Sequence, residues 1–137
     1  MAESRIEGGC NCGAVRYVLT AEPQVVAACH CSNCRRQSGA AFSVNLVVPL
    51  DAMEVTGELA SYADHDTASG KTVHRQYCGS CGSPIRSLLD SAPEIAAVKA
   101  GTADEPGRFA PAVHVWTSSA LPWVHIPDNL PQFPRNP

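Results

Sequence analysis

Seven cysteines in three tight clusters constrain the fold of this 137-residue chain more than any other feature of its sequence. The clusters are GGCNCG, with Cys10 and Cys12, CHCSNC, with Cys29, Cys31 and Cys34, and CGSCG, with Cys78 and Cys81. An odd number of thiols cannot pair completely into disulfides within one chain. In a reducing compartment, clustered thiols bind metal more often than they form disulfides. The clusters therefore predict metal sites.

The spacing inside the clusters is typical of zinc ligands. A C-x2-C pair followed by glycine, as in Cys78 to Gly82, forms a tight turn that points backbone N–H groups at the sulfur atoms. Glycine tolerates the positive φ that such a turn needs. A C-x-C pair on an extended segment, such as Cys10 and Cys12, has both side chains on one face, where they can share a metal ion.

The seven thiols divide into a set of four and a set of three. A structural zinc site has four protein ligands, whereas a catalytic site has three and keeps one position open. The CGSCG pair needs two more ligands, which the GGCNCG pair supplies, and the CHCSNC cluster then binds a second ion. We therefore expect two Zn2+ ions per chain. The spacing also permits a closed site made of Cys10, Cys12, Cys29 and Cys31.

Charge and hydropathy exclude several kinds of partner. The formal net charge is -3 and there is no basic run, which argues against nucleic acid and anionic membranes as partners. The longest apolar stretch, Phe42 to Leu50, is interrupted by polar residues and is too short to span a bilayer. The N-terminus lacks the apolar core of a signal peptide. We expect a cytoplasmic protein that acts on small molecules.

Short apolar segments separated by turn residues predict an all-β domain. Eleven prolines and ten glycines punctuate the chain. The expected strands are Arg16 to Thr20, Val25 to Ala28, Phe42 to Val48, Glu54 to Thr56, Leu59 to Tyr62, Thr72 to Tyr77, Ile85 to Leu89, Ile95 to Lys99 and Val113 to Trp116. One short helical turn is expected from Asn33 to Ser38, with Ser32 as its N-cap and Gly39 at its end.

The chain is expected to form one zinc-binding domain over residues 5–124 followed by a short tail. Residues 125–137 contain four prolines, which disfavour regular structure. We expect this tail to lie extended and packed on the surface of the domain.

The cysteine motifs and their surroundings resemble a known family. The stretches that carry the resemblance are GGCNCGAVRY, CHCSNCRRQSGAAF, YCGSCGSPI, PAVHVW and PWVHIPDNLPQF. From about Arg5 to Phe133 they are similar to the glutathione-dependent formaldehyde-activating enzyme (GFA) family. The resemblance implies a β-tent fold of short antiparallel strands. It also implies a structural zinc on Cys10, Cys12, Cys78 and Cys81, and a catalytic zinc on Cys29, Cys31 and Cys34.

The activity that the resemblance implies is that of a carbon–sulfur lyase, which joins glutathione and formaldehyde to S-hydroxymethylglutathione. A zinc ion held by three thiolates keeps one position for a thiol, and the metal favours loss of the thiol proton. The resulting thiolate can attack an aldehyde carbon. The expected partners are therefore a small thiol, glutathione, and an aldehyde. The alternative is a non-catalytic binding module whose second zinc is closed by another ligand, such as His114 or a side chain of a partner protein.

Several neighbours of the CHCSNC cluster are candidates for substrate binding. Arg35 or Arg36 could grip a substrate carboxylate, or both could belong to a solvated helical turn. His114 could act as acid or base at the site, although a lone strand histidine is more often packed or exposed. His30 lies between two ligands on an extended segment, so we expect its side chain on the opposite face from theirs.

Overall fold

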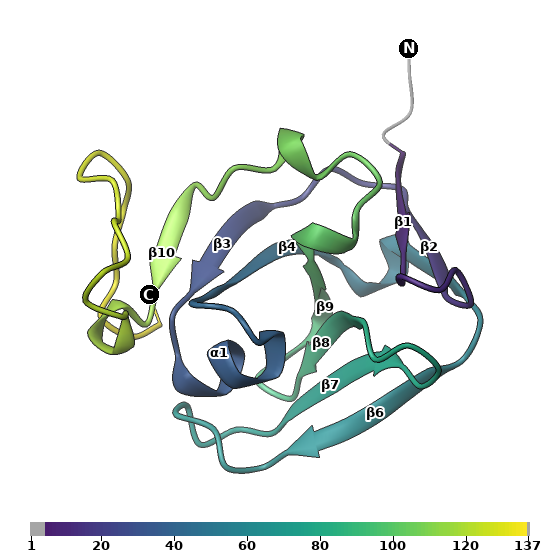
Figure 1. Ribbon diagram of the computed structural model, residues 1–137, viewed down its shortest axis with the longest axis horizontal. Helices are drawn as coiled ribbons and strands as arrows, with labels where there is room; N and C mark the ends of the chain where they lie inside the picture. Colours follow the sequence, from purple (N-terminus) through teal and green to yellow (C-terminus); the bar gives the residue numbers. More distant parts are fainter. Residues whose placement is uncertain (1–4, 137) are drawn as a thin grey trace.

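A computed structural model describes residues 5–136, which form two sheets. The smaller sheet has the order β1-β2-β5, and its strands are β1 (Ile6–Gly9), β2 (Arg16–Leu19) and β5 (Met53–Thr56). The larger sheet has the order β10-β3-β4-β9-β8-β7-β6 (Figure 1). Its strands are β3 (Val25–Cys29), β4 (Ser43–Pro49), β6 (Leu59–Asp64), β7 (Val73–Cys78), β8 (Pro84–Leu89), β9 (Ala92–Lys99) and β10 (Val113–Val115).

The all-β prediction is confirmed, with three differences in detail. All nine expected strands overlap observed ones, but β1 was not expected, because its sequence IEGG offers a single large apolar residue. The strand pairs are antiparallel except for β10, which pairs in parallel with β3. Short 3-10 helices that the turn composition did not specify are η1 (Leu50–Ala52), η2 (Ala100–Thr102), η3 (Pro106–Arg108) and η4 (Thr117–Ser119).

The short helix α1 (Ser32–Ser38) begins one residue before the predicted start. Its N-cap is Cys31 rather than Ser32, because the Cys31 sulfur accepts a hydrogen bond from the Cys34 N–H at 3.3 Å. Gly39 ends the helix with φ 67°, as predicted. Figure 1 shows α1 between the β3–β4 side and the β7–β6 side of the larger sheet. This position brings a cysteine-bearing turn against the sheet face.

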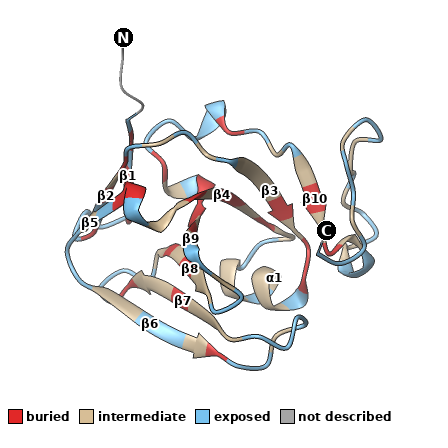
Figure 2. Ribbon diagram, turned by 180° about the vertical axis from the view of Figure 1, so that it is seen from behind, coloured by how far each residue is buried: buried red, intermediate tan, exposed pale blue. Residues whose placement is uncertain are grey.

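Side chains on β4 and β9, in the middle of the larger sheet, alternate between the hydrophobic core and a second face of the sheet. Leu46, Val48, Ala96 and Val98 are fully buried in the hydrophobic core between the sheets. Their neighbours on β4 and β9 point the other way, as the two-residue period of a strand requires. In Figure 2 the buried residues gather on the middle strands, whereas β6 at the edge is largely exposed or half-buried. The second face of these strands therefore forms the wall of a cavity, described below.

The C-terminal segment runs along the free edge of β10. His114 N–H donates to the Pro131 carbonyl at 3.1 Å, and Phe133 N–H donates to the His114 carbonyl at 2.9 Å. Gln132 forms an isolated parallel bridge with His114. The predicted boundary between a domain of residues 5–124 and a tail of residues 125–137 stays a prediction, and residue 137 lies outside the described residues. No helix within residues 5–136 is long and apolar enough to cross a membrane.

Candidate functional site

The structure brings the first and third cysteine clusters together. The sulfur atoms of Cys10, Cys12, Cys78 and Cys81 all lie within 4.8 Å of one another. The Cys10 and Cys12 sulfurs are 3.6 Å apart, and those of Cys12 and Cys78 are 3.8 Å apart. Four sulfurs about 2.3 Å from a tetrahedral zinc ion lie about 3.8 Å from each other. The four thiols thus fit a metal ion, in the grouping favoured by spacing.

The loops around these four thiols have the expected turn geometry. Gly13 and Gly82 follow the second cysteine of each pair, and both have positive φ, at 83° and 82°. The Val15 N–H donates to the Cys10 sulfur at 3.2 Å. A hydrogen bond between the Ser83 hydroxyl and the Cys81 sulfur lowers the pKa of Cys81 to about 5. These contacts stabilise the thiolate of Cys81, the form that binds metal. A backbone hydrogen bond at Ala14 lowers the pKa of Cys12, but the neighbouring thiols Cys10 and Cys81 raise it more, to about 11.

The second cluster consists of Cys29, Cys31 and Cys34, whose sulfurs also lie within 4.8 Å of one another. Cys29 ends β3, Cys31 caps α1 and Cys34 lies in its first turn. Three thiols this close fit a metal ion and leave the fourth tetrahedral position without a cysteine ligand.

A cavity of about 230 Å³ opens beside this second cluster, and we call it the thiol cavity. Strands β3, β4, β7, β8, β9 and β10 contribute side chains of one sheet face. Its lining includes all three cysteines of the second cluster and none of the first. The lining residues are Ala27, Cys29, Cys31, Cys34, Asn45, Val47, Thr67, Ala68, Ser69, Val73, Arg75, Ser87, Leu89, Ile95, Ala97, Lys99, Val115, Trp116 and Asn136.

Two buried cations lie in the wall of the thiol cavity. The Arg75 Nη1 donates to the Cys34 sulfur at 3.8 Å, while its Nε donates to the Asp64 carboxylate at 3.0 Å. The Lys99 Nζ donates to Asn45 Oδ1 at 3.2 Å. Neighbouring thiols of the cluster lower the pKa of Cys34, and the charges of Lys99 and Arg75 lower it further. Burial lowers the pKa of Lys99, and the charge on Cys34 opposes that shift.

The structure positions three predicted substrate-binding residues outside the thiol cavity. His114 Nδ1 is hydrogen-bonded to His30 Nε2 at 2.9 Å, and both imidazoles are buried. Burial lowers the pKa of each. Neither Arg35 nor Arg36 is among the cavity residues, and Arg36 is exposed. A role of Arg35, Arg36 or His114 in substrate binding stays a prediction.

The His30–His114 pair also bears on the binding-module alternative. His30 does not line the cavity that its neighbours Cys29 and Cys31 line, in agreement with the opposite face expected for it. His114 is on β10 next to Val115, which does line the cavity. In this arrangement the His114 ring is hydrogen-bonded to His30 rather than directed at the three thiols. It is thus not positioned as their fourth partner.

Sequence reasoning missed the polar residues of the thiol cavity. Arg75, Ser87 and Lys99 come from β7, β8 and β9, far from the cysteine motifs in sequence. The available signal was a polar residue inside an otherwise apolar strand, as with Asn45 in SVNLVVP and Lys99 in APEIAAVK. In most proteins such residues are exposed. That these residues instead converge on one cavity could be recognised only once the pairing of the strands was known.

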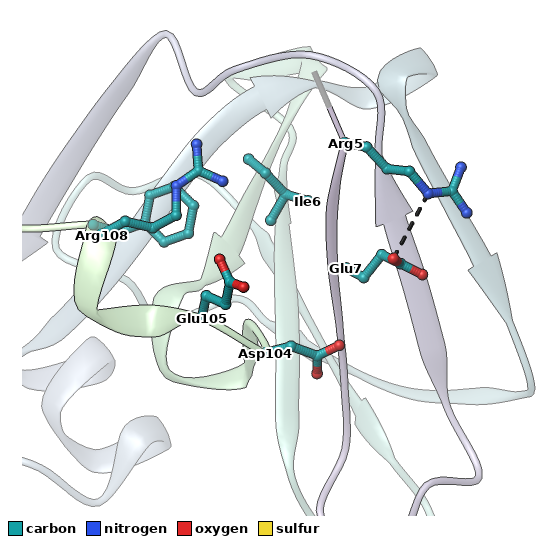
Figure 3. A pocket seen from close by; sticks show the side chains of 7 residues that line it. Arg5, Ile6, Glu7, Asp104, Glu105 and Arg108 are labelled. Atoms are coloured by element: carbon teal, nitrogen blue, oxygen red, sulfur yellow. Dashed lines mark ion pairs between the residues drawn. The ribbon is translucent and has the colours of Figure 1, made fainter. Parts of the chain in front are cut away.

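A second cavity of about 180 Å³ lies between β1 and the segment from Asp104 to Phe109 (Figure 3). Charged side chains dominate it, and Arg5 pairs with Glu7 at 3.7 Å. Its lining residues are Arg5, Ile6, Glu7, Asp104, Glu105, Arg108 and Phe109. The Asp104 carboxylate is already held by Arg16 at 2.6 Å and 3.0 Å. This cavity contains no thiol, and we assign it no chemistry.

The Asp64–Arg75 pair is expected to stabilise the wall of the thiol cavity. Both residues are buried, and Asp64 also accepts a hydrogen bond from Asn33 on α1 at 3.0 Å. Replacing Asp64 by alanine leaves the buried Arg75 charge without its carboxylate, which costs about 3–5 kcal/mol of unfolding free energy. Urea unfolding measures this change. In the matched control Asp90→Ala, which removes the exposed partner of His74, the cost is at most about 1 kcal/mol. Equal costs for the two variants would contradict a structural role for the buried pair.

The fold and the two clusters define a class of small all-β proteins whose cysteines are arranged to hold metal. Residues 5–119 match the model of the family described as glutathione-dependent formaldehyde-activating enzyme. The chain belongs to this family, which confirms the resemblance seen in the sequence.

Three similar proteins carry the name of this family. One from Halomonas elongata is 29% identical over 126 residues, which cover 88% of this chain and 80% of the relative. One from Penicillium rubens is 30% identical over 90% of this chain and 56% of the relative. One from Phaeosphaeria nodorum is 34% identical over 96% of this chain and 62% of the relative. This chain thus spans less than two thirds of either fungal protein.

A solved structure has the same fold. The crystal structure of a Rhodobacter sphaeroides protein superposes with a TM-score of 0.54 at 20% sequence identity. The match covers 93% of this chain and 98% of that protein. At this identity the likeness extends to the fold alone.

Proposed function

We propose that this chain is a zinc-dependent carbon–sulfur lyase that forms or cleaves a thiol–aldehyde adduct, with glutathione as the thiol. The observation that carries the proposal is the asymmetry of the two clusters. Three cysteines, Cys29, Cys31 and Cys34, line a cavity large enough for a substrate. Membership of the glutathione-dependent formaldehyde-activating family supports the same reaction class.

Each cluster has its own part in the proposal. Cys10, Cys12, Cys78 and Cys81 would hold a structural zinc, because four thiols complete a tetrahedron. Cys29, Cys31 and Cys34 would hold the second zinc, which when bound supplies a position where an incoming thiol becomes acidic.

The cationic residues of the cavity wall support a reaction in which negative charge develops near the thiols. Arg75 and Lys99 are the cations on this wall, and they face a cluster that is negatively charged when its thiols are ionised. Asp64 and Asn45 hold these two side chains in position. Much of the remaining lining is apolar, and charge interactions are stronger in apolar surroundings than in bulk water. Such a wall orients a polar substrate group beside the thiols.

An exchange experiment tests this function. Glutathione and formaldehyde combine reversibly without a catalyst, and exchange between free and bound 13C-formaldehyde can be followed by NMR. Zinc-loaded wild-type protein should accelerate this exchange, and Cys34→Ser should reduce it to the rate without protein. Asp90→Ala, a change at an exposed ion pair, should behave like the wild type. Equal acceleration by Cys34→Ser and wild type would rule out a catalytic role for the second cluster.

A further inference from the structure

Four polar side chains converge at one end of the thiol cavity. Asn45, Arg75, Ser87 and Lys99 are all at least nine-tenths buried, with exposures of 8%, 3%, 5% and 6%. In the sheet register Asn45 pairs with Lys99, and Ser87 pairs with both Arg75 and Ala97. Ser87 and Lys99 are therefore diagonal neighbours on the same sheet face.

Two of these side chains have hydrogen-bonding capacity to spare. Ser87 Oγ is buried and has no hydrogen-bond partner among residues 5–136. Within residues 5–136, Lys99 Nζ has one hydrogen-bond partner, Asn45 Oδ1, and an amine nitrogen has further donor capacity in either protonation state. A buried hydroxyl without a partner costs stability, so its presence on a cavity wall points to a ligand atom that completes it.

Aliphatic side chains line much of the remaining thiol cavity. Strands β4, β7, β8, β9 and β10 contribute aliphatic side chains to it, namely Val47, Val73, Leu89, Ile95, Ala97 and Val115. The volume is about 230 Å³. An apolar cavity of about 150 Å³ is already enough to bind benzene. Formaldehyde, which has two heavy atoms and no substituent, would leave most of this space unfilled.

We propose that the thiol cavity binds an aldehyde with an aliphatic or aromatic substituent, whose oxygen is held by Lys99 Nζ and Ser87 Oγ. The substituent packs on Val47, Leu89, Ile95 and Ala97. This inference rests on the proposed function and names its aldehyde class. Lys99 and Ser87 contact the reacting oxygen and are thus catalytic residues in the addition.

The reaction balances with the groups named. The thiol loses its proton to solvent, and its sulfur forms a bond to the aldehyde carbon. The π electrons of the C=O bond move to oxygen, and that oxygen takes up one proton, which gives a neutral hemithioacetal. Hydrogen bonds from Lys99 and Ser87 stabilise the negative charge that develops on oxygen before the proton arrives.

Glutathione itself is poorly suited to the apolar end. It carries two carboxylates and an ammonium group, and burial of such charges without partners is costly. The rim of the thiol cavity offers Ser69 and Asn136, which are exposed and polar. The peptide part of the thiol therefore fits the rim, while the aldehyde substituent fits the interior.

A chain-length series tests the substituent. With glutathione fixed and zinc loaded, kcat/KM should rise about fourfold per methylene from acetaldehyde through butanal until the cavity is full. Ala97→Leu fills the apolar end, so in that variant the gain with chain length should disappear. The matched control Ala110→Leu makes the same change at an exposed position, and its kcat/KM should rise with chain length as in the wild type.

A second variant tests the oxygen site. Ser87→Ala should lower kcat/KM by about tenfold, by the same factor for every aldehyde, because each presents the same oxygen. The melting temperature should not fall, since Ser87 Oγ gives up no hydrogen bond within the described chain. A purely structural Ser87 would leave kcat/KM unchanged, and that result would overturn the oxygen assignment.

A binding measurement separates this proposal from the proposed function. Trp123→Phe leaves Trp116, which lines the cavity, as the sole tryptophan of the chain. Its fluorescence should respond to hexanamide, an unreactive carbonyl compound with the same alkyl chain as hexanal, at concentrations where acetamide has no effect. If kcat/KM stays constant or falls as the aldehyde lengthens while adducts still form, the substituent assignment is overturned, whereas the proposed lyase function is not. Hexanamide binding without any accelerated adduct formation would support the apolar site and overturn the lyase.

Discussion

Cys78→Ser should unfold most of the protein at room temperature, whereas Cys34→Ser should leave it folded and inactive. Cys78 belongs to the set of four thiols, and structural zinc contributes on the order of 10 kcal/mol to folding in zinc-finger peptides. Natural domains have a total stability of about 5–15 kcal/mol, so the loss of much of this contribution is decisive. Circular dichroism melts of the two variants measure the difference.

Cys81→Ser provides the matched control for this prediction. Cys78 is also part of the hydrophobic core, with 1% exposure, so its replacement disturbs packing as well as metal binding. Cys81 is exposed and belongs to the same set of four thiols, so its replacement removes a ligand without disturbing the core. Cys81→Ser should therefore lose almost as much stability as Cys78→Ser. A Cys81→Ser protein as stable as Cys34→Ser would contradict the structural role of this cluster.

A mild chelator should remove one of two zinc ions and abolish activity while the fold survives. Three protein ligands hold a metal ion less tightly than four, and the thiol cavity gives the chelator access to the second cluster. Zinc release can be counted with a metallochromic dye while circular dichroism follows the strands. Added zinc should restore the activity.

Release of both zinc ions in a single step would contradict this prediction. If both equivalents of zinc leave together with the loss of β-sheet signal, the division into a structural and a substrate-facing site is wrong. Falling pH should produce the same order of release as the chelator, because protons compete with zinc for thiolates.

The sequence could predict those parts of the fold that depend on local residue patterns. Alternating apolar residues and turn residues indicated the strands, and CGSCG and GGCNCG indicated the metal-binding turns. Gly82 was correctly expected to have positive φ and Gly39 to end the helix, and both have positive φ, which few other residues adopt. The helix start was wrong by one residue, because a cysteine sulfur rather than the Ser32 hydroxyl accepts the capping hydrogen bond.

The parts that could not be predicted depend on long-range register. Lys99 meets Asn45 only because β9 pairs with β4, and Arg75 reaches Cys34 only because α1 lies against the sheet face. His30 and His114 meet because β10 pairs in parallel with β3, an arrangement that no local pattern indicated. The cysteine motifs therefore located the candidate site, whereas its polar wall emerged only from the folded structure.

The most direct test of the account is the binding of a thiol at the second cluster. In protein loaded with cobalt in place of zinc, sulfur-to-metal charge-transfer bands report how many thiolates surround the metal. Glutathione should increase these bands as a fourth sulfur joins Cys29, Cys31 and Cys34, and the analogue with serine in place of cysteine should not. The increase should need less glutathione as pH rises towards neutrality, because the incoming thiol must lose its proton. An unchanged spectrum at millimolar glutathione, in protein whose three cysteines hold the cobalt, would contradict thiol activation at this site.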